Sequence, residues 1–165
     1  MIQVERREGG CGALCREILA GLPDWFGIPE ANEAYAHDAE ARPTWVALED
    51  GAPVGLMILR WHGADAVEIS LIAVQHSRRN TGIGRALIAA AEQAGRSAQT
   101  RFLTVKTRGP SAPTPSAEYD ETRAFYRALG FFVLEEFPTL WDPNNPALFL
   151  LKPLQNGKAS PVDST

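Results

Sequence analysis

Apolar and polar residues follow two different periods along this chain, and the changes of period divide it into strands and helices. Short runs of β-branched and aliphatic residues predict strands, whereas apolar residues at helical spacing predict amphipathic helices. The predicted strands are Ile2–Arg6, Thr44–Glu49, Pro53–Trp61, Val67–Val74, Phe102–Thr107, Phe131–Phe137 and Ala147–Lys152. The predicted helices are Cys11–Leu22, Pro29–Glu40, one from Ile83 that ends at Gly95, and one in Glu121–Phe132 that Gly130 stops. The pattern therefore predicts a mixed α/β domain of about seven strands and four helices.

The segment from Val67 to Arg85 contains the most informative chemistry. A strand that suits burial on both faces leads into the basic turn Arg79–Gly84, which opens a helix. Its two glycines let the backbone approach a ligand closely. Free N–H groups at a helix N-terminus and the helix dipole both favour an anion. The turn therefore predicts a site for a phosphate-bearing ligand.

Two common phosphate motifs do not fit this turn. A P-loop needs Lys and then Ser or Thr after the second glycine, and the chain reads Gly84-Arg85-Ala86. A dinucleotide fingerprint needs a small residue where Leu87 stands, and an acidic residue about 20 positions further on, where the chain reads Arg101-Phe102-Leu103. A tight turn that binds no ligand stays open on this hexapeptide alone.

Two motifs together favour a third interpretation. Arg-x-x-Gly-x-Gly after an apolar strand, at Arg79–Gly84, resembles the acetyl-coenzyme A loop of the GCN5-related N-acetyltransferases (GNAT family). Phe125–Phe131, FYRALGF, resembles the family's Phe-Tyr-x-x-x-Gly-Phe element, and the two motifs stand in the family's order with a strand between them. The chain is therefore identified as a member of this family. The resemblance implies a single domain over residues 1–152, with a central, mostly antiparallel sheet and flanking helices.

The resemblance also implies how acetyl-coenzyme A, the only cofactor expected, is held. The end of the central strand would pair with the pantetheine amides as an extra strand does, and a backbone N–H near Val74 would polarise the thioester carbonyl. The amides of the turn would take the pyrophosphate. The residues implied are Ile72, Ala73, Val74, Arg79, Asn80, Thr81, Gly82, Ile83, Gly84, Arg85 and Phe125. A bulky residue in place of Gly82 or Gly84 is expected to abolish coenzyme binding and to leave the fold largely intact.

Two side chains are candidates for the proton transfers of acyl transfer. Tyr126 matches the family's tyrosine, and a phenol that is protonated at pH 7 can donate to the leaving thiolate. Packing beside Phe125 is its alternative role. Glu68, between two apolar residues of the central strand, is the candidate general base, because a carboxylate there is costly unless it faces a cleft, water or a partner. A structural ion pair is the alternative for Glu68.

Three further groups bear on ligands. Arg78, Arg79 and Arg85 add positive charge beside the predicted phosphate site, or form a solvated basic turn. Acidic residues could attract a cationic amine, although such charges more often form a solvated helix face; they are Glu30, Glu33, Asp38, Glu40, Glu118, Asp120 and Glu121. Aromatic residues could line an acceptor pocket or fill the core; they are Trp25, Phe26, Tyr35, Trp61 and Trp141. The Pro- and Ser-rich stretch Gly109–Glu118 is either a solvated linker or the rim of the acceptor site.

Composition excludes several classes. The chain has 165 residues, 45% of them hydrophobic, and a net charge of −4, so nothing indicates a nucleic-acid or membrane surface. No run approaches the roughly 18 apolar residues of a membrane-spanning helix, and the N-terminus has no apolar signal core. A cytoplasmic protein is the expectation. The polar tail from Pro153 lacks periodicity and is expected to be disordered.

Cysteine and histidine give no sign of metal or redox chemistry. Cys11 and Cys15 lie one helical turn apart and are expected to be small buried hydrophobes in a reducing compartment. His37, His62 and His76 are scattered without metal-ligand spacing, so no metal site is predicted.

Two functions follow from the resemblance. The first is an acetyl-coenzyme A-dependent N-acetyltransferase that acts on a primary amine of a small molecule or a peptide N-terminus, by direct attack in a ternary complex. The alternative is a non-catalytic acyl-coenzyme A-binding module of the same fold. Tyr126 favours the enzyme, because a binding module needs no proton donor there. The sequence leaves open the acceptor and the oligomeric state, although homodimers are common in the family.

Overall fold

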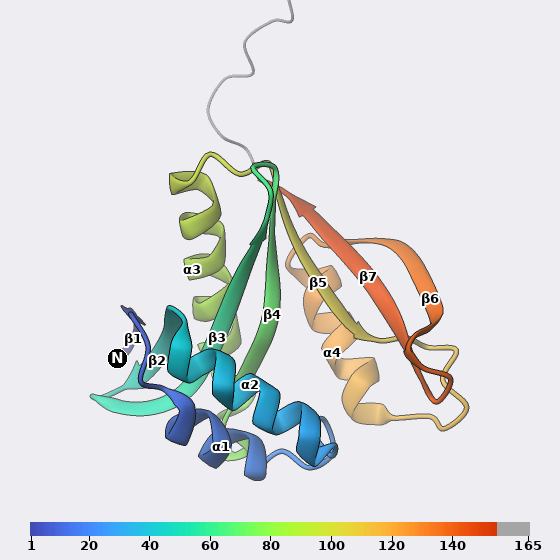
Figure 1. The fold of residues 1–165 in the computed structure, drawn as a ribbon, viewed down its shortest axis with the longest axis horizontal. Coiled ribbons are helices and arrows are strands. Elements are labelled where there is room, and N and C mark those ends of the chain that lie inside the picture. Colours follow the sequence, from blue (N-terminus) through green and yellow to red (C-terminus); the bar gives the residue numbers. More distant parts are fainter. Residues whose placement is uncertain (155–165) are drawn as a thin grey trace, which may run out of the picture.

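A computed structural model describes residues 1–154, and its elements follow the predicted order (Figure 1). The strands are β1 (Ile2–Arg7), β2 (Thr44–Glu49), β3 (Ala52–His62), β4 (Ala66–Val74), β5 (Phe102–Arg108), β6 (Phe132–Asp142) and β7 (Asn145–Pro153). The helices are α1 (Gly12–Ala20), α2 (Pro29–Ala41), α3 (Ile83–Ser97) and α4 (Ala117–Ala128), with a 3₁₀ turn η1 (His76–Arg78) before α3. No helix in this described part is long and apolar enough to cross a membrane.

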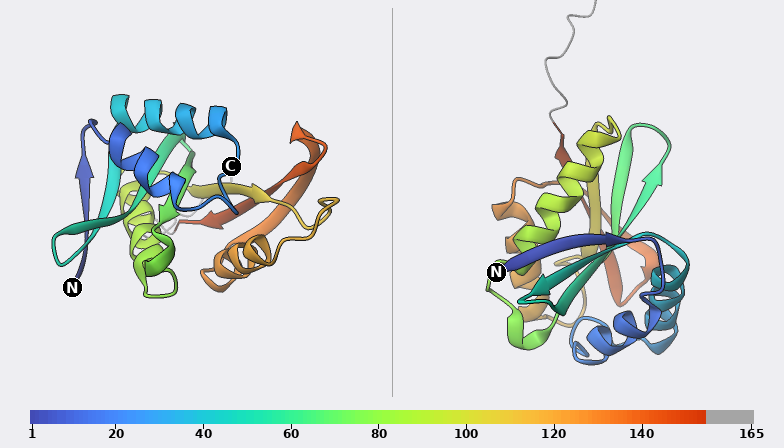
Figure 2. Two further views of the ribbon diagram at one scale, coloured as in Figure 1. Left: turned by 90° about the horizontal axis from the view of Figure 1, so that it is seen from below. Right: turned by 90° about the vertical axis from the view of Figure 1, so that its left-hand side faces the viewer.

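The seven strands form one sheet in the order β1-β2-β3-β4-β5-β7-β6. Every neighbouring pair is antiparallel except β4 and β5, which are parallel. Helices α1 and α2 cover one face of the sheet, and α3 and α4 cover the other, as the left view of Figure 2 shows. The predicted mostly antiparallel sheet of seven strands with four helices is therefore confirmed.

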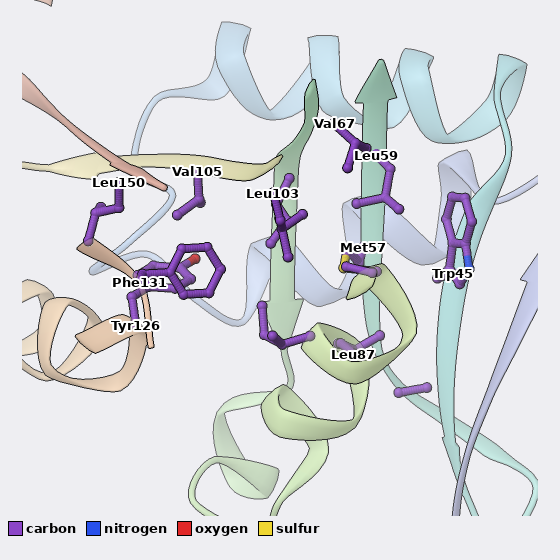
Figure 3. Close-up of a cluster of buried hydrophobic side chains, with 14 of the residues drawn as sticks. Trp45, Met57, Leu59, Val67, Leu87, Leu103, Val105, Tyr126, Phe131 and Leu150 are labelled. Atoms are coloured by element: carbon purple, nitrogen blue, oxygen red, sulfur yellow. The ribbon is translucent and has the colours of Figure 1, made fainter. Parts of the chain in front are cut away.

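Each face of the sheet has its own hydrophobic core, as two covering layers require. The core under α1 and α2 includes Cys11, Cys15, Ile18, Leu19, Val46, Leu56, Leu71 and Ala73. The core under α3 and α4 includes Met57, Val67, Leu87, Leu103, Val105, Tyr126, Phe131 and Leu150. Figure 3 shows this second core, with Tyr126 and Phe131 beside Val105. The predicted general acid is thus built into the packing between α4 and the sheet.

A β-bulge at Ser70 reverses the sidedness of β4. In β3, Leu59 pairs with Ile69 of β4, and the preceding residue, Ile58, pairs with Leu71. Ser70 of β4 therefore has no partner in β3. Consequently Ile69 faces the core under α3 and α4, whereas Leu71 faces the core under α1 and α2. An extra residue of this kind bends its strand and increases the local twist.

The parallel pairing of β4 with β5 ends at the same place. The last pair is Ile69 with Val105, whereas β4 continues beside β3 as far as Val74. Figure 1 shows the two strands meeting at one end and diverging toward the other. On the side of β5, the edge of β4 from residue 70 to 74 is therefore not paired with any strand.

Helix α3 continues past Gly95, where the sequence predicts its end. The helix ends at Ser97 instead, and Gly95 lies buried within it. A Cβ at Gly95 would lie 2.5 Å from Cδ1 of Leu154. The glycine therefore makes room for a residue distant in sequence and has no capping role.

The folded domain extends two residues beyond its predicted boundary. Pro153 pairs with Phe102 at the end of β7, and Leu154 is buried, with its N–H donating to the carbonyl of Arg101 at 2.8 Å. The rest of the predicted tail, residues 155–165, lies outside the described residues.

The Pro- and Ser-rich stretch Gly109–Glu118 is shorter and more firmly held than a solvated linker. Helix α4 already begins at Ala117, because the side chain of Ser116 caps its first turn. Ser111 donates its N–H (3.1 Å) and its hydroxyl (2.5 Å) to Oε1 of Glu136 on β6. These hydrogen bonds therefore attach the stretch to β6.

Candidate active site

A cleft of ≈ 1670 Å³ lies where β4 and β5 diverge. Its walls come from the connection between α1 and α2, α2 itself, β4, the turn before α3, β5, α4, the end of β6 and the start of β7. The rim of the Pro- and Ser-rich stretch, Thr114 to Ser116, also lines it. Of the residues predicted for coenzyme binding and catalysis, all line this cleft except Thr81 and Ile83.

The free edge of β4 forms one wall. Ile72, Ala73 and Val74 all line the cleft, and only β3 pairs with this part of the strand. Backbone N–H and C=O groups at an unpaired strand edge can bond to an extended ligand as they would to another strand. This edge fits the amides of a pantetheine arm.

The turn before α3 presents backbone N–H groups to the same cleft. Asn80 (φ +62°) and Gly82 (φ +92°) both adopt left-handed backbone conformations, and Gly82 is the N-cap without a side-chain capping bond. The first bond of the helix runs from the N–H of Ala86 to the carbonyl of Gly82 at 3.0 Å. The N–H groups before Ala86 thus have no partner within the helix, which suits a phosphate. Thr81 turns away and donates its hydroxyl to the carbonyl of Arg78 at 2.6 Å.

Gly84 brings the two sequence motifs together. A Cβ at Gly84 would lie 3.1 Å from Cζ of Phe125, which means that the aromatic ring rests on the helix start. Ile83, the other residue outside the cleft lining, is buried in the core under α3. The missing side chain at Gly84 is therefore needed for packing against α4, as well as for access by a ligand.

The three arginines of the turn have different roles. Arg78 forms an ion pair with Glu49 of β2 at 2.9 Å. The guanidinium of Arg79 stacks on the ring of Trp25, 4.1 Å from its centroid. Arg85 lines the cleft from the first turn of α3. Arg79 and Arg85 remain candidates for phosphate contacts, whereas Arg78 already has a carboxylate partner.

Tyr126 is buried between aromatic neighbours. Its side chain is only 3% exposed, and its ring lies 5.4 Å from the rings of both Phe125 and Phe131. Burial raises the pKa of the Tyr126 phenol above its ordinary value, since the charged form loses its hydration. The phenol therefore stays protonated throughout the neutral range, as a proton donor must.

Glu68 forms an ion-pair network on the other side of the sheet. Its carboxylate accepts hydrogen bonds from Nζ of Lys106 at 2.5 Å and from Nε2 of His62 at 3.1 Å. Burial alone would raise the pKa of Glu68, but the bonds from Lys106 and His62 together outweigh it and lower the pKa. The structural ion pair considered from the sequence is thus present, and Glu68 is a carboxylate at neutral pH.

This network leads to a prediction on stability. Because the pKa of Glu68 is lower in the folded than in the unfolded chain, its contribution is present above the unfolded pKa and is lost as the pH falls through the folded pKa. Lys106→Met leaves that carboxylate without its closest cation, so we expect unfolding free energy to fall by about 1–2 kcal/mol at pH 7. The loss is expected to shrink at pH 4, because this lies below the ordinary glutamate pKa of 4.5, where part of this stabilisation has already been lost. Urea unfolding at both pH values measures the difference.

The exposed pair of Arg16 and Glu33 provides the control for that experiment. Both side chains are more than half exposed, so Arg16→Met is expected to change stability little at either pH. An equal loss for Lys106→Met at pH 7 and pH 4 would mean that Lys106 stabilises the fold by packing alone.

Most of the acidic residues that could attract a cation already have partners outside the cleft. Glu33 pairs with Arg16, Asp38 pairs with Arg42 and Arg60, and a carboxylate oxygen of Glu40 accepts the N–H of Gly12. Asp120 pairs with the buried Arg123 of its own helix. Of the whole group only Glu118 and Glu121 line the cleft. The acidic surface of α2 is thus a structural feature, as such helix faces usually are.

Most of the predicted aromatic candidates do line the cleft. They are Trp25, Phe26, Tyr35 and Trp141. Trp61 lies elsewhere, with its Nε1 donating to Oγ1 of Thr100 at 3.1 Å. The cleft is therefore rich in aromatic surface.

Lys106, Arg108 and Tyr119 are among the cleft residues that went unrecognised in the sequence. Lys106 and Arg108 alternate outward along β5, and Tyr119 lies in the first turn of α4. The hydroxyl of Tyr119 donates to the carbonyl of Trp25 at 2.6 Å, across 94 positions of sequence. The alternation of polar residues in LTVKTR was the one available signal, and it gave no indication of what those residues would face.

Both cysteines are buried and unpaired to one another, in the core under α1 and α2. Burial raises the pKa of the Cys15 thiol to about 11, so it is an unreactive thiol at neutral pH. Within residues 1–154, no three His, Cys, Asp or Glu side chains gather in a way that could hold a metal ion.

Comparison with known proteins follows the geometry. The sequence model of the acetyltransferase (GNAT) domain matches residues 40–133, which is more than half of the chain. That range includes β4, the turn before α3, and the Phe-Tyr motif of α4. No curated protein matches the chain by sequence.

Solved structures share the fold at low sequence identity. The ribosomal-protein-S18-alanine N-acetyltransferase of Escherichia coli superposes with a TM-score of 0.75 at 18% identity and 100% coverage of both chains. The aminoglycoside 6'-N-acetyltransferase of Enterococcus faecium gives 0.72 at 16% identity, covering 95% of this chain and 99% of that one. A GNAT-family acetyltransferase of Elizabethkingia anophelis with acetyl-CoA bound gives 0.71 at 16% identity, covering 93% and 98%. At these identities the likeness concerns the fold.

Proposed function

The chain belongs to the GNAT acetyltransferase family, and on that premise we propose that it transfers the acetyl group of acetyl-coenzyme A to a primary amine of a small molecule or a peptide N-terminus. The observation that carries the proposal is the convergence of three features in one cleft. They are the unpaired edge of β4, the open N-terminus of α3, and the buried phenol of Tyr126. The first two suit a donor, and the third suits a leaving group.

The residues present fit acetyl-coenzyme A. The pyrophosphate would lie on the N–H groups from Gly82 to Arg85, which no side chain caps. The pantetheine arm would extend along residues 72 to 74 of β4, where no strand competes for the backbone. The thioester would then lie at the divergence of β4 and β5, with a backbone N–H near Val74 toward its carbonyl oxygen.

Two side chains on opposite sides of the sheet would move the protons. Tyr126 lies in the core under α3 and α4, whereas Glu68 alternates with residues of that core and therefore faces the other side. In the proposed transfer the amine nitrogen attacks the carbonyl carbon, the C–N bond forms and the C–S bond breaks. Glu68 accepts the proton of the amine through water, and Tyr126 gives its proton to the thiolate. The opening between the strands lets the acceptor and the donor meet from the two sides.

The pairing of Glu68 with Lys106 has a kinetic consequence under this mechanism. A carboxylate with a lowered pKa is a weak base, so deprotonation of the amine depends on the free amine already present at a given pH. The acetyltransferases of Escherichia coli and Enterococcus faecium that share the fold act, by their names, on an alanine and on an aminoglycoside. Such diversity supports an amine acceptor. The class of amine must then be inferred from the residues that line this chain's own cleft.

Release of free coenzyme A thiol in the presence of amines tests the proposal. Amine-dependent release, with an acetylated product of the expected mass, is the result that we expect. Calorimetry with acetyl-coenzyme A and with coenzyme A measures donor binding independently. If the protein binds the coenzyme but none of the amines stimulates thiol release, it is a binding module and the proposed transfer is wrong.

A further inference from the structure

Two hydrogen-bond donors in the cleft have no acceptor among the described residues. They are Nε1 of Trp25 and Nε of Arg108, and both atoms are buried. A buried donor without a partner is costly, so native structures rarely leave one unsatisfied. The third unpartnered atom, Oδ1 of Asn32, is an acceptor and its residue lines the same cleft. A ligand that brings its own acceptor atom would satisfy the donor of Arg108.

Arg108 lies beside other polar residues of the cleft. Its guanidinium lies 5.8 Å from the ring centroid of Tyr119, whose hydroxyl bonds to the backbone carbonyl of Trp25. Arg108 shares its face of β5 with Lys106, the partner of Glu68. Arg108 therefore lies on the side of the sheet from which the acceptor would approach.

No carboxylate of the described residues is hydrogen-bonded to Arg108, although acids lie around the cleft. Its Nη2 reaches only the carbonyl of Asn144, at 3.4 Å, and no ion pair of the described residues includes it. Asp142 lies near enough for its charge to interact with that of Arg108, but its carboxylate accepts hydrogen bonds from the N–H groups of Asn144 and Asn145 in its own turn. Glu68 is held by Lys106. An anionic group on the ligand would therefore find a ready cation at Arg108.

The acids of the cleft offer little to a polycation in return. Glu118 accepts the hydroxyl of Ser116, and its pKa is lowered chiefly by its own backbone N–H. Asp24 and Glu121 also line the cleft, but both are exposed, so their attraction for an ammonium group is screened by solvent.

Large apolar side chains stand exposed around the same opening. Ile28 is 49% exposed, Leu140 54% and Trp141 49%; all three line the cleft, Ile28 from the residue before α2 and the other two from the end of β6. Inside them, Phe26 and Tyr35 form an edge-to-face pair with ring centroids 6.2 Å apart. Exposed apolar residues that gather at one opening indicate an apolar ligand there.

From these observations we infer that the acceptor is an amine with an aromatic body and a carboxylate, the chemistry of a free aromatic amino acid. The carboxylate binds at Arg108, the aromatic ring lies among the apolar side chains of the opening, and the amine faces Glu68. This inference rests on the proposed acetyl transfer and uses the same bond changes. The acetyl group moves to the amine nitrogen, which loses a proton, and the coenzyme thiolate gains one.

A matched set of acceptors tests the inference. We expect kcat/KM for L-phenylalanine to exceed that for L-phenylalaninamide, which lacks the carboxylate, by about tenfold or more, since a hydrogen bond to a charged group is worth about 1.5–3 kcal/mol. L-Alanine, which lacks the ring, and spermidine, a polycation, are expected to be poorer still. Equal or better rates with spermidine or with the amide would overturn the inference and leave the proposed transfer standing. If neither these four amines nor any other amine gives thiol release, both the inference and the proposed transfer are overturned.

Two arginine variants separate recognition from general damage. Arg108→Gln is expected to lower the ratio of kcat/KM for L-phenylalanine over L-phenylalaninamide by about tenfold. Arg101→Gln removes an exposed arginine that lies outside the cleft, on the ring of Phe102, and is expected to leave that ratio unchanged. An unchanged ratio for Arg108→Gln, in a variant whose thermal unfolding matches the wild type, would show that Arg108 does not bind the carboxylate.

Discussion

Tyr126→Phe is expected to lower kcat by about 100-fold, because loss of a positioned proton donor typically costs 10²–10⁴ in rate. The fold is expected to tolerate the change. The ring keeps its contacts with Phe125 and Phe131, and no hydrogen bond described for residues 1–154 involves the Tyr126 hydroxyl. Steady-state kinetics on an accepted amine give kcat, and calorimetry shows whether the affinity for the coenzyme is retained.

Phe131→Leu is the matched control for Tyr126→Phe. It disturbs the same aromatic packing without removing a hydroxyl, so its kcat is expected to stay within a few-fold of the wild type. If Tyr126→Phe keeps the wild-type kcat, Tyr126 is a packing residue only. If both variants lose the same activity, the cause is the packing of α4.

Gly84→Val is expected to weaken coenzyme binding at least 100-fold, or about 2.7 kcal/mol. Its Cβ would come within 3.1 Å of the Phe125 ring, so either the ring or the turn must move. Both movements disturb the N–H groups that would hold the pyrophosphate, and the added methyl groups occupy space that the ligand needs. Titration with coenzyme A measures the loss directly.

Ala89→Val provides the control for Gly84→Val, since it places the same β-branched residue at an exposed position of α3. It is expected to share the small loss of helix propensity and to keep the affinity for the coenzyme. Normal binding by Gly84→Val would mean that the turn is not the phosphate site. Gly82 is less suitable for this test, because any side chain at φ +92° is strained. The expectation that both glycines can be replaced at no cost to the fold is thus revised for Gly82.

Elements whose signals are local were predictable from the sequence. The period of apolar residues located every strand and helix, because alternation and helical spacing follow from backbone geometry alone. Gly130 ends α4 as predicted: it adopts φ +89°, which glycine tolerates better than other residues. The two motifs of the cleft were recognisable for the same reason, because the backbone conformation of each short stretch depends on residues within that stretch.

Boundaries set by distant contacts were not predictable in this way. Gly95 has the appearance of a helix end, but its neighbour Leu154 comes from the far end of the described chain. The polar tail was placed to start at Pro153 because local composition does not show that β7 still pairs with β5 there. Local rules failed at these positions because packing, which depends on the order of strands in the sheet, decided the outcome.

The sequence by itself thus determined the kinds of element and the family, and it indicated the turn that we propose to bind the donor. Only the tertiary structure decided what the candidate catalytic and acceptor-binding side chains face. Glu68 meets Lys106 because β4 and β5 are neighbours in the sheet, 38 positions apart in sequence. The pairing of β4 with β5 ends at the bulge at Ser70, and Arg108 and Trp25, 83 positions apart in sequence, both line the cleft that opens there. The physical reason is that strand alternation determines which residues share a face, whereas the other elements that cover that face depend on the whole fold.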